Sequence, residues 1–474
     1  MDGDRGAERS AADRALVEEV RRHSGALRKE LSLTNLVLTQ VVYIAGLSWL
    51  GAAAKLGSAH VFYWLPAAIF FYVPSAIVVI HLTGEMPLEG GLYQWAKLRW
   101  GPLLGFLTAW NLWLYGVLLL AELGIVTTNN LAYATGAAWI AEDKAISIAV
   151  AIGLVGFLAL AALRGLAIGK WLHNVAGATL IVLFVAMLCF AVPRWLDGRA
   201  TTAPAALAAP AFTLFNLNIL GKMSFGAFSG SEGVSVFAGE IRDPDAARAI
   251  RRSVWLAAPV VTAIFTVGTA CMLASSRPED LDLVSPVAQN LNAGARALGL
   301  GGSVVPAVMA LMLLARFGTG SMAFNVSARL PMLAGWDHVL PPWFTRLHPR
   351  WRTPATAIGF VTIVVLAFAV AANLGVGSQE AFQLLQSGSG ISYALTYVVM
   401  FSIPLAAPGP RAPWTVRVAA ASGLAMTLLY VVLSIFPIVD VASGRSFTLK
   451  ISAVVVGSNV LGAAFFLLRS RRLR

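Results

Sequence analysis

Twelve stretches of the chain are long and apolar enough to cross a membrane, and they constrain the fold more than any other feature. Each approaches or exceeds the ~20 residues needed to span a hydrocarbon core. The chain is 58% hydrophobic and only 12% charged, whereas soluble domains carry about 25% charged residues. The sequence therefore predicts an all-α integral membrane protein with twelve transmembrane helices. The stretches are Leu31–Ala54, Val61–Gly84, Trp100–Ala121, Ala145–Leu163, Trp171–Pro193, Phe212–Gly239, Ser253–Ser276, Ala297–Val326, Thr353–Gln379, Ala381–Pro410, Val418–Val439 and Ile451–Leu468.

The distribution of lysine and arginine predicts how these spans are oriented. If both termini face the cytoplasm, the inner segments carry 25 of the 35 basic residues and the outer loops carry eight. An excess of Lys and Arg beside the span ends marks the cytoplasmic side. The formal net charge of +12 then belongs to a surface that contacts anionic membrane lipids, and nucleic acid is not expected as a partner. We expect a multi-pass protein of the cell membrane with both termini cytoplasmic.

The sixth span contains the break that points most directly to a binding site. Ser224–Gly233 interrupts an apolar segment with glycines, serines and Glu232. Backbone that leaves the helix at bilayer depth survives only beside a polar cavity or inside protein, and an acid there is costly unless it has a function. The first span has a weaker break at Tyr43–Trp49. Close helix packing through glycine is the competing explanation, and it competes most strongly at Gly46.

The two breaks lie five spans apart, and this spacing predicts an inverted repeat. Because five is odd, the second unit enters the membrane from the opposite side, and paired interrupted helices mark a midplane site in such folds. We expect a cytoplasmic tail over residues 1–30, a first five-span repeat over 31–193 and a second over 212–410. Residues 411–474 would then form spans eleven and twelve with a basic cytoplasmic C-terminus.

Several motifs resemble the amino acid–polyamine–organocation superfamily of secondary transporters. Pro87–Tyr93 resembles the Pro-x-x-Gly-Gly-x-Tyr signature of that family, Phe228–Glu232 its Phe-x-Gly-x-Glu break, and Gly239–Pro244 the loop that follows. Ser327–Pro354 resembles the loop between spans eight and nine, and the likeness covers roughly residues 31–410. The resemblance implies the five-plus-five inverted-repeat fold of the leucine-transporter type, with discontinuous helices 1 and 6. It also implies transport of amino acids or related amines without an enzymatic step.

Two departures from the family pattern limit what can be transferred to this chain. The first-span break of the family is usually Gly-x-Gly, whereas here Gly46 is followed by Leu47 and Ser48. Some proton-coupled members carry a lysine in the fifth span near the position of Leu180, and this span has none after Lys170. The lysine-based coupling mechanism is therefore not expected here.

The two breaks together suit a zwitterion, since a free amino acid has a carboxylate and an ammonium that each need a partner once dehydrated. N–H groups where the first span restarts can hold the carboxylate, and carbonyls freed in the sixth span can accept from the ammonium. The predicted substrate-binding residues are Ala45, Gly46, Leu47, Ser48, Trp49, Tyr115, Ala227, Phe228, Ser229 and Gly230. Phe228 is the candidate lid over the substrate, and plain packing is its alternative role.

Glu122 is the first of two intramembrane acids that are candidates for coupling. It follows a long uncharged run of the third span, in which Asn111 and Tyr115 are candidates for the wall of the site. If Glu122 lies deep, it carries a proton or anchors a cationic substrate. If the span ends near Ala121, it lies instead at the outer interface.

Glu232 is the second coupling candidate, with Lys222 considered as its partner. Bonding of N–H groups freed at the break is its alternative, structural role. Thr319 and Ser321 are weaker candidates that could offer oxygens to a sodium ion, although hydroxyls in membrane helices more often bond their own backbone.

The remaining sequence features exclude other classes of protein. Cys189 and Cys271 are isolated within spans and provide neither a disulfide framework nor the spacing of a metal site, and we expect no cofactor and no enzymatic activity. The sequence predicts a secondary active transporter of amino acids, driven by proton symport or by exchange for a counter-substrate. A polyamine or cationic amino acid carrier is the alternative within transport, and a transporter-like amino acid sensor is the alternative of another class.

Overall fold

The computed structural model describes most of the chain, and the regular elements that it labels are helices. The described residues are 32–44, 46–86, 91–164, 166–203, 212–232, 241, 243, 246–336, 340–351, 353–406 and 411–471. The predicted tail, Ala45 and the Pro87–Gly90 part of the signature motif lie outside these residues.

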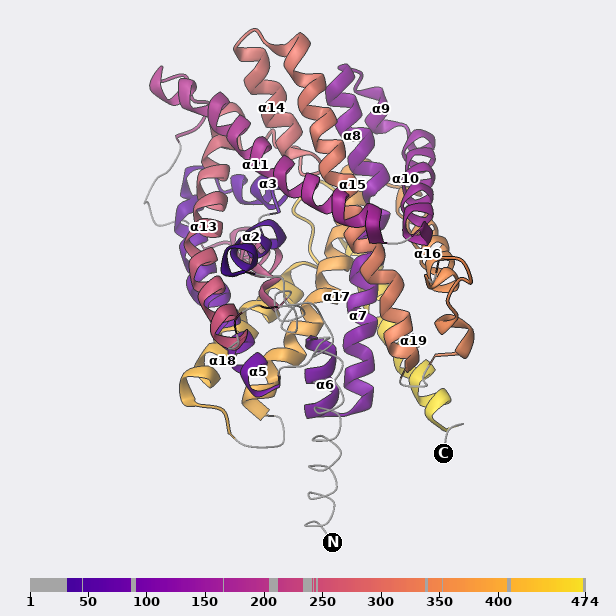
Figure 1. Cartoon of the computed structure of the whole chain (residues 1–474). Helices are drawn as coiled ribbons and strands as arrows, with labels where there is room; N and C mark the ends of the chain where they lie inside the picture. The colour runs from indigo at the N-terminus through magenta and orange to yellow at the C-terminus, as the bar shows by residue number, and fades with distance from the viewer. Residues whose placement is uncertain are drawn as a thin grey trace.

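Figure 1 shows the helices gathered in one bundle, with α9 and α14 at one end and α6 at the other. In chain order the first half contains α2 (Leu33–Ile44), α3 (Trp49–Ala54), η1 (Gly57–Ala59), α4 (His60–Ala67), η2 (Ala68–Tyr72), α5 (Val73–Glu85), α6 (Leu92–Trp100), α7 (Pro102–Ala121), α8 (Leu123–Thr135), α9 (Trp139–Glu142), α10 (Lys144–Arg164) and α11 (Leu166–Leu196). The second half contains α12 (Leu214–Gly221), η3 (Lys222–Ala227), α13 (Ala246–Ser275), α14 (Pro286–Ala297), α15 (Gly301–Trp336), η5 (Pro342–Thr345), α16 (Ala355–Asn373), α17 (Ser378–Ala406), α18 (Trp414–Leu433) and α19 (Gly444–Arg471).

Ten helical stretches among the described residues are long and apolar enough to cross a membrane. Their apolar sequences form helices because only a helix satisfies every backbone N–H and C=O group within one lipid-embedded segment. The first and sixth predicted spans do not belong to these ten. The first is divided into α2 and α3, and the described helix of the sixth runs through α12 and η3 only as far as Phe228, where it stops. The structure thus confirms an all-helical membrane protein in which helices 1 and 6 are discontinuous.

The third span is longer than the sequence predicted. The membrane-length stretch is Pro102–Thr135 and does not end near Ala121. The helix continues because the N–H group of Val126 donates to the Glu122 carbonyl at 3.0 Å. It stops at Gly136, whose φ of 72° is the left-handed conformation that commonly ends helices. Glu122 therefore lies within this helical stretch and not at its end.

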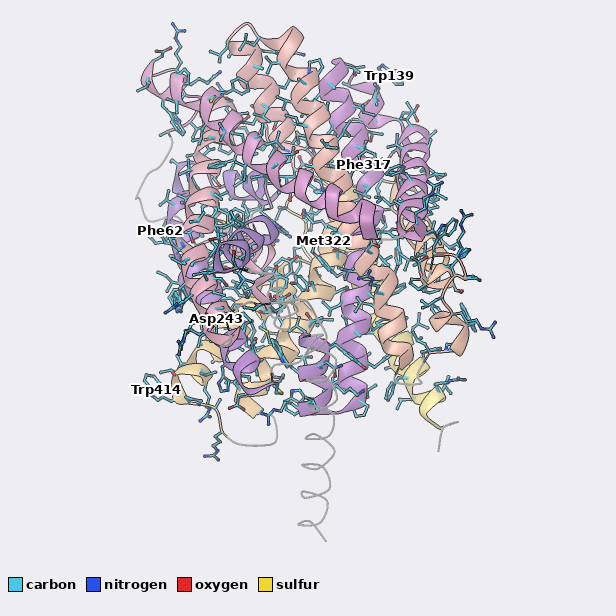
Figure 2. All side chains as sticks on the ribbon, viewed as in Figure 1. Phe62, Trp139, Asp243, Phe317, Met322 and Trp414 are labelled. Atoms are coloured by element: carbon cyan, nitrogen blue, oxygen red, sulfur yellow. The ribbon has the colours of Figure 1, made fainter. Side chains whose placement is uncertain are left out.

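The surface of the bundle suits a bilayer. Large apolar side chains such as Ile69, Ile181 and Ile363 are more than half exposed on its outside. Trp139 and Trp414 are also exposed, and Figure 2 shows them at opposite ends of the molecule. Indole rings concentrate at the two membrane–water interfaces, so these tryptophans are placed as interface anchors would be.

Aromatic side chains form the part of the core that surrounds the sixth-span break. The Trp64 ring stacks on Phe265, with centroids 4.8 Å apart. Phe225 packs edge-on against Phe71 and Tyr397 at centroid distances of 5.6 and 5.2 Å. Such pairs add to the stabilisation that comes from burial alone. The broken helix is thus held by rigid neighbours from the second, seventh and tenth spans.

Candidate functional site

The sixth-span break is built on an unusual backbone. Its first half ends in a π-helical turn, η3, and regular structure stops after Phe228. Gly230 follows with a φ of 113°, a conformation that side-chain-bearing residues rarely adopt. Its N–H group is satisfied from outside the segment, because it donates to the Tyr397 hydroxyl at 2.8 Å. The break therefore depends on a contact with α17.

Glu232 is clamped by two tyrosines of α17. The hydroxyl of Tyr393 donates to one carboxylate oxygen and that of Tyr397 to the other. The two tyrosines are four residues apart, so they share one helix face. The N–H groups of Gly230 and of Glu232 itself also lie within reach of this carboxylate. This geometry supports the structural role that the sequence offered as the alternative for Glu232.

Lys222, the partner considered for Glu232, lies in a different environment. Its ammonium donates to the Ser434 hydroxyl at 3.4 Å and stands 5.8 Å from the centre of the Tyr430 ring. Both partners belong to the eleventh span or to its end. The pairing with Glu232 is therefore not what the structure shows, because the broken helix turns the two side chains toward different neighbours.

Two N–H groups of the first-span break donate to carbonyls of the same segment. The N–H group of Gly46 donates to the Ile44 carbonyl at 2.6 Å, and that of Trp49 donates to the Gly46 carbonyl at 3.3 Å. Two of the N–H groups predicted to hold a carboxylate are thus engaged in local turns in this conformation. Leu47 and Ser48 form the turn between them, and Ala45 is outside the described residues.

The two breaks meet at Trp49 and Gly226. A Cβ atom built on Gly226 would lie only 2.6 Å from the Trp49 ring, so glycine is required for this close approach. A second contact is more distant, since the Gln40 side chain donates to the Ser231 carbonyl at 3.4 Å. The predicted residues Trp49, Ala227 and Gly230 are therefore brought into one region of the molecule.

Phe228 is completely buried between the second and seventh spans. Its ring lies 5.5 Å from Trp64, 5.3 Å from Tyr72 and 5.3 Å from Phe265, measured between centroids. This environment favours the packing role that was the alternative to a lid. The lid role stays a prediction for another conformation.

The structure separates the two wall candidates of the third span. Tyr115 stacks on Tyr393 at 4.5 Å and so joins the group around Glu232. Asn111 exchanges hydrogen bonds with Asn459 of α19 at 2.7 and 3.1 Å. The prediction that Asn111 lines the wall beside Tyr115 is therefore wrong, because α19 covers this part of α7.

Glu122 is buried and forms an ion pair that the sequence did not predict. One of its carboxylate oxygens lies 3.7 Å from a terminal nitrogen of Arg316 on α15. The other oxygen has no hydrogen-bond partner among the described residues. An arginine inside an apolar span was the only sequence signal for this pair, since intramembrane charges usually face one another or a polar cavity.

A cavity of about 180 Å³ lies beside this ion pair, and hereafter it is called the Arg316 cavity. It extends from Gly46, Leu47 and Ser48 at the first-span break to Arg316 and Thr319 on α15. The Thr319 hydroxyl donates to the Ala315 carbonyl at 3.2 Å, as hydroxyls in membrane helices commonly do. The Arg316 guanidinium, one helical turn before Thr319, would repel a cation. The structure therefore does not support the prediction of a sodium site at Thr319 and Ser321.

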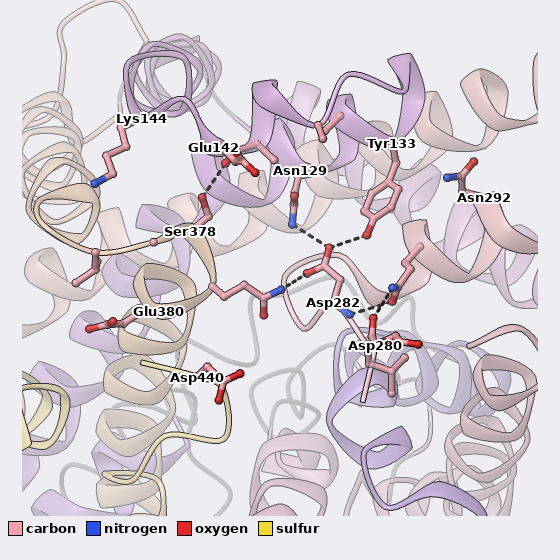
Figure 3. A pocket seen from close by; sticks show the side chains of 18 of the residues that line it. Asn129, Tyr133, Glu142, Lys144, Asp280, Asp282, Asn292, Ser378, Glu380 and Asp440 are labelled. Carbon is pink, nitrogen blue, oxygen red and sulfur yellow. Dashed lines mark hydrogen bonds between the residues drawn. The ribbon is translucent and has the colours of Figure 1, made fainter. Parts of the chain in front are cut away.

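A larger cavity of about 1180 Å³ opens between α9, α14 and the start of α17, and we call it the acidic vestibule. Figure 3 shows Asn129 and Tyr133 pointing toward Asp282 in its centre, where each donates to the carboxylate at 3.0 Å. Burial raises the pKa of Asp282, although these hydrogen bonds oppose the shift. The acidic residues of its lining are Glu142, Glu279, Asp280, Asp282, Glu380 and Asp440, against the basic Lys144 and Arg296.

The sequence of this chain is similar to those of known membrane transporters. Residues 29–458 match the sequence model described as amino acid permease. An uncharacterized transporter of Legionella pneumophila is 24% identical over 383 residues, which cover 79% of this chain and 80% of that protein. The low-affinity putrescine importer PlaP of Escherichia coli is 26% identical over 359 residues, covering 72% and 74%.

A solved structure shows the same fold. The crystal structure of MhsT in complex with L-phenylalanine superposes with a TM-score of 0.55 at 12% sequence identity. The superposition covers 86% of this chain and 99% of MhsT. The fold is therefore of the leucine-transporter type, as the resemblance implied.

Proposed function

This chain belongs to the amino acid permease family of the amino acid–polyamine–organocation superfamily, and we propose that it moves amino acids across the cell membrane by alternating access. It is accordingly a secondary transporter and not an enzyme. The observation that carries the substrate proposal is the contact between two interrupted helices, where Trp49 of the first lies against Gly226 of the second. Paired broken helices at a repeat interface are where such folds bind solute.

The proposed orientation follows the basic residues. Both termini would face the cytoplasm, and the acidic vestibule, which is lined by α9 and α14, would open to the outside. Solute would then enter through the vestibule and reach the Arg316 cavity and the two breaks beneath it. The 25 to 8 division of Lys and Arg supports this assignment.

For the coupling step we propose Glu122 and assign Glu232 a structural role. Both oxygens of Glu232 already accept from tyrosines, whereas one oxygen of Glu122 is unpartnered among the described residues. A buried carboxylate that can exchange its ionic partner for a proton is suited to carry that proton across the membrane. This supports proton symport, with exchange as the alternative.

A second candidate function is transport of polyamines or cationic amino acids. Six acidic and two basic side chains line the vestibule, and a mouth with an excess of one charge sign raises the local concentration of oppositely charged solutes. The relative PlaP is named as a putrescine importer. These two observations favour a cationic solute at the entrance.

Flux through proteoliposomes tests these functions. A carrier accumulates labelled amino acid and shows counterflow, whereas a sensor binds the same solute and shows neither. The Glu122→Gln variant should lose the dependence of uptake on external pH, while Asp197→Asn, at an exposed acid outside the vestibule lining, should keep it. An unchanged pH profile in Glu122→Gln would remove Glu122 from the coupling step. Binding without counterflow in the wild-type protein would overturn the transport proposal.

A further inference from the structure

The Arg316 cavity contains polar groups that the proposed function does not yet use. Asn130 of α8 and Ser285, which precedes α14, line it together with Arg316. The remaining lining is mostly apolar and includes Leu180, Leu183 and Met312. Asn130, Ser285 and Arg316 therefore come from three separate elements of the chain and line the same cavity.

Asn130 is the least expected of these groups. Its side chain has 0% exposure, and among the described residues neither its amide oxygen nor its amide nitrogen has a hydrogen-bond partner. The Ser285 hydroxyl, also buried, is unpartnered in the same sense. Buried polar groups are nearly always hydrogen-bonded, so three unsatisfied atoms around one cavity point to a polar occupant.

The charge of the cavity comes from Arg316. Its contact with Glu122, at 3.7 Å, is an ion pair through one terminal nitrogen. A guanidinium has five N–H donors in a planar fork that matches a carboxylate. Arg316 can therefore bind a second carboxylate, or exchange Glu122 for one, and a carboxylate can also accept from the amide nitrogen of Asn130.

We infer that the Arg316 cavity is a subsite for the carboxylate of the transported solute, held by Arg316, Asn130 and Ser285. The inference rests on the proposed function and narrows its substrate class to solutes with a carboxylate, in preference to diamines and polyamines. A diamine would bring an ammonium beside a guanidinium, where like charges repel. At about 180 Å³ the cavity is smaller than the ~300–1,000 Å³ typical of drug-sized sites, so it suits one end of a small solute.

Glu122 and the solute would then compete for the same cation. When the solute carboxylate occupies Arg316, Glu122 loses its partner, and a lone buried carboxylate is costly to keep charged. It would bind a proton from the side that supplied the solute. Among the charged and titratable groups that the structure describes, Arg316 on α15 faces Glu122 directly and Tyr115 lies on its own helix. Partner exchange at Arg316 thus links solute binding to proton uptake.

The experiment compares matched pairs that differ only in the carboxylate. Purified full-length protein is titrated with ornithine and putrescine, arginine and agmatine, leucine and 3-methylbutylamine, and phenylalanine and phenethylamine, with calorimetry as the readout. We expect the amino acid of the best-bound pair to bind at least tenfold more tightly than its amine. Equal or tighter binding of the amine would overturn the inference.

Variants locate the preference. Arg316→Gln should abolish the preference for the amino acid over its amine. Arg316→Lys should keep part of this preference, because the positive charge remains while the planar set of guanidinium donors is lost. Asn130→Ala should reduce the preference several-fold. Arg199→Gln, a matched loss of charge at an exposed arginine that lines neither cavity, should leave it unchanged. Glu122→Gln should bind the amino acid more tightly because the competitor is gone. A preference that survives in Arg316→Gln would exclude the subsite.

The design separates the two proposals. If labelled amino acid shows counterflow while Arg316→Gln keeps the preference, the subsite is wrong and the transport function stands. If the preference depends on Arg316 while no solute moves, the subsite stands and the transport function fails. If Arg316→Gln does not fold, Arg316→Lys is compared with the wild-type protein instead. An undiminished preference for the amino acid in Arg316→Lys would contradict the proposed role of the Arg316 guanidinium.

Discussion

The two helix breaks differ in what satisfies their backbone. The first-span break closes on itself, since Gly46 and Trp49 donate to carbonyls two and three residues earlier. The sixth-span break depends on another helix, because Tyr397 of α17 accepts from Gly230 and donates to Glu232. A break held by local turns can change conformation by itself, whereas a break held by a neighbour moves only with that neighbour or after losing it. The first break is therefore the freer of the two.

The largest effect should come from Gly230→Val. A β-branched residue is strained at a φ of 113°, at a cost of about 1–3 kcal/mol, and the break would have to change shape. Uptake in proteoliposomes should fall to background while the protein stays monodisperse on gel filtration. Gly359→Val is the control, because a Cβ added at this helical glycine would meet no atom within 4 Å apart from its chain neighbours and the nearby backbone of its own helix. Normal uptake by Gly230→Val would contradict this placement of the site.

Tyr397→Phe should follow in size. It leaves one Glu232 oxygen and the Gly230 N–H group without this partner, and an unsatisfied buried group costs about 1–3 kcal/mol. The midpoint of thermal unfolding should drop and transport should fall at least several-fold. Tyr393→Phe removes the hydrogen bond to the other Glu232 oxygen but leaves the Gly230 contact with Tyr397 in place, so its effect should be milder. A reversed order of the two variants would show that the Gly230 contact does not matter.

Paired alanine substitutions compare the two breaks directly. In Gly226→Ala the new methyl group would meet the Trp49 ring at 2.6 Å, whereas in Gly46→Ala it would lie 3.5 Å from the same ring. Overpacking of this kind costs about 1–3 kcal/mol, so Gly226→Ala should lower both stability and uptake. Gly46→Ala should retain most activity. If Gly226→Ala and Gly46→Ala lost the same amount of thermal stability and of flux, the proposal that the first-span break is less constrained than the sixth-span break would be contradicted.

The smallest effect should come from Gln40→Ala. Its hydrogen bond to the Ser231 carbonyl is long, at 3.4 Å, and a typical hydrogen bond contributes only about 0.5–1.5 kcal/mol. We expect a decrease of a few degrees in the unfolding midpoint and uptake within about twofold of the wild-type value. A loss as large as that of Tyr397→Phe would mean that the first span also clamps the sixth.

The sequence was sufficient to predict the spans and where two of them break. Apolar runs without charge indicate segments that contact lipid. The Gly230 region combines glycines and serines, which let the chain leave the helix, with an acid that is costly at membrane depth. The third span was predicted too short, because an acid such as Glu122 normally marks a span end. The structure shows that the helix continues past Glu122 and that Glu122 pairs with Arg316, which lies nearly two hundred residues away in the chain.

By itself, the sequence determined the membrane class, the family and the positions of the interrupted helices, because these depend on local hydropathy and on motifs that a single segment carries. Only the tertiary structure decided which side chains satisfy the breaks and which charges meet. Tyr393 and Tyr397 looked like ordinary aromatic residues of an apolar helix, and Asn111 like a wall of the site. Partner choice depends on how helices pack, and packing brings together residues whose separation along the chain carries no signal.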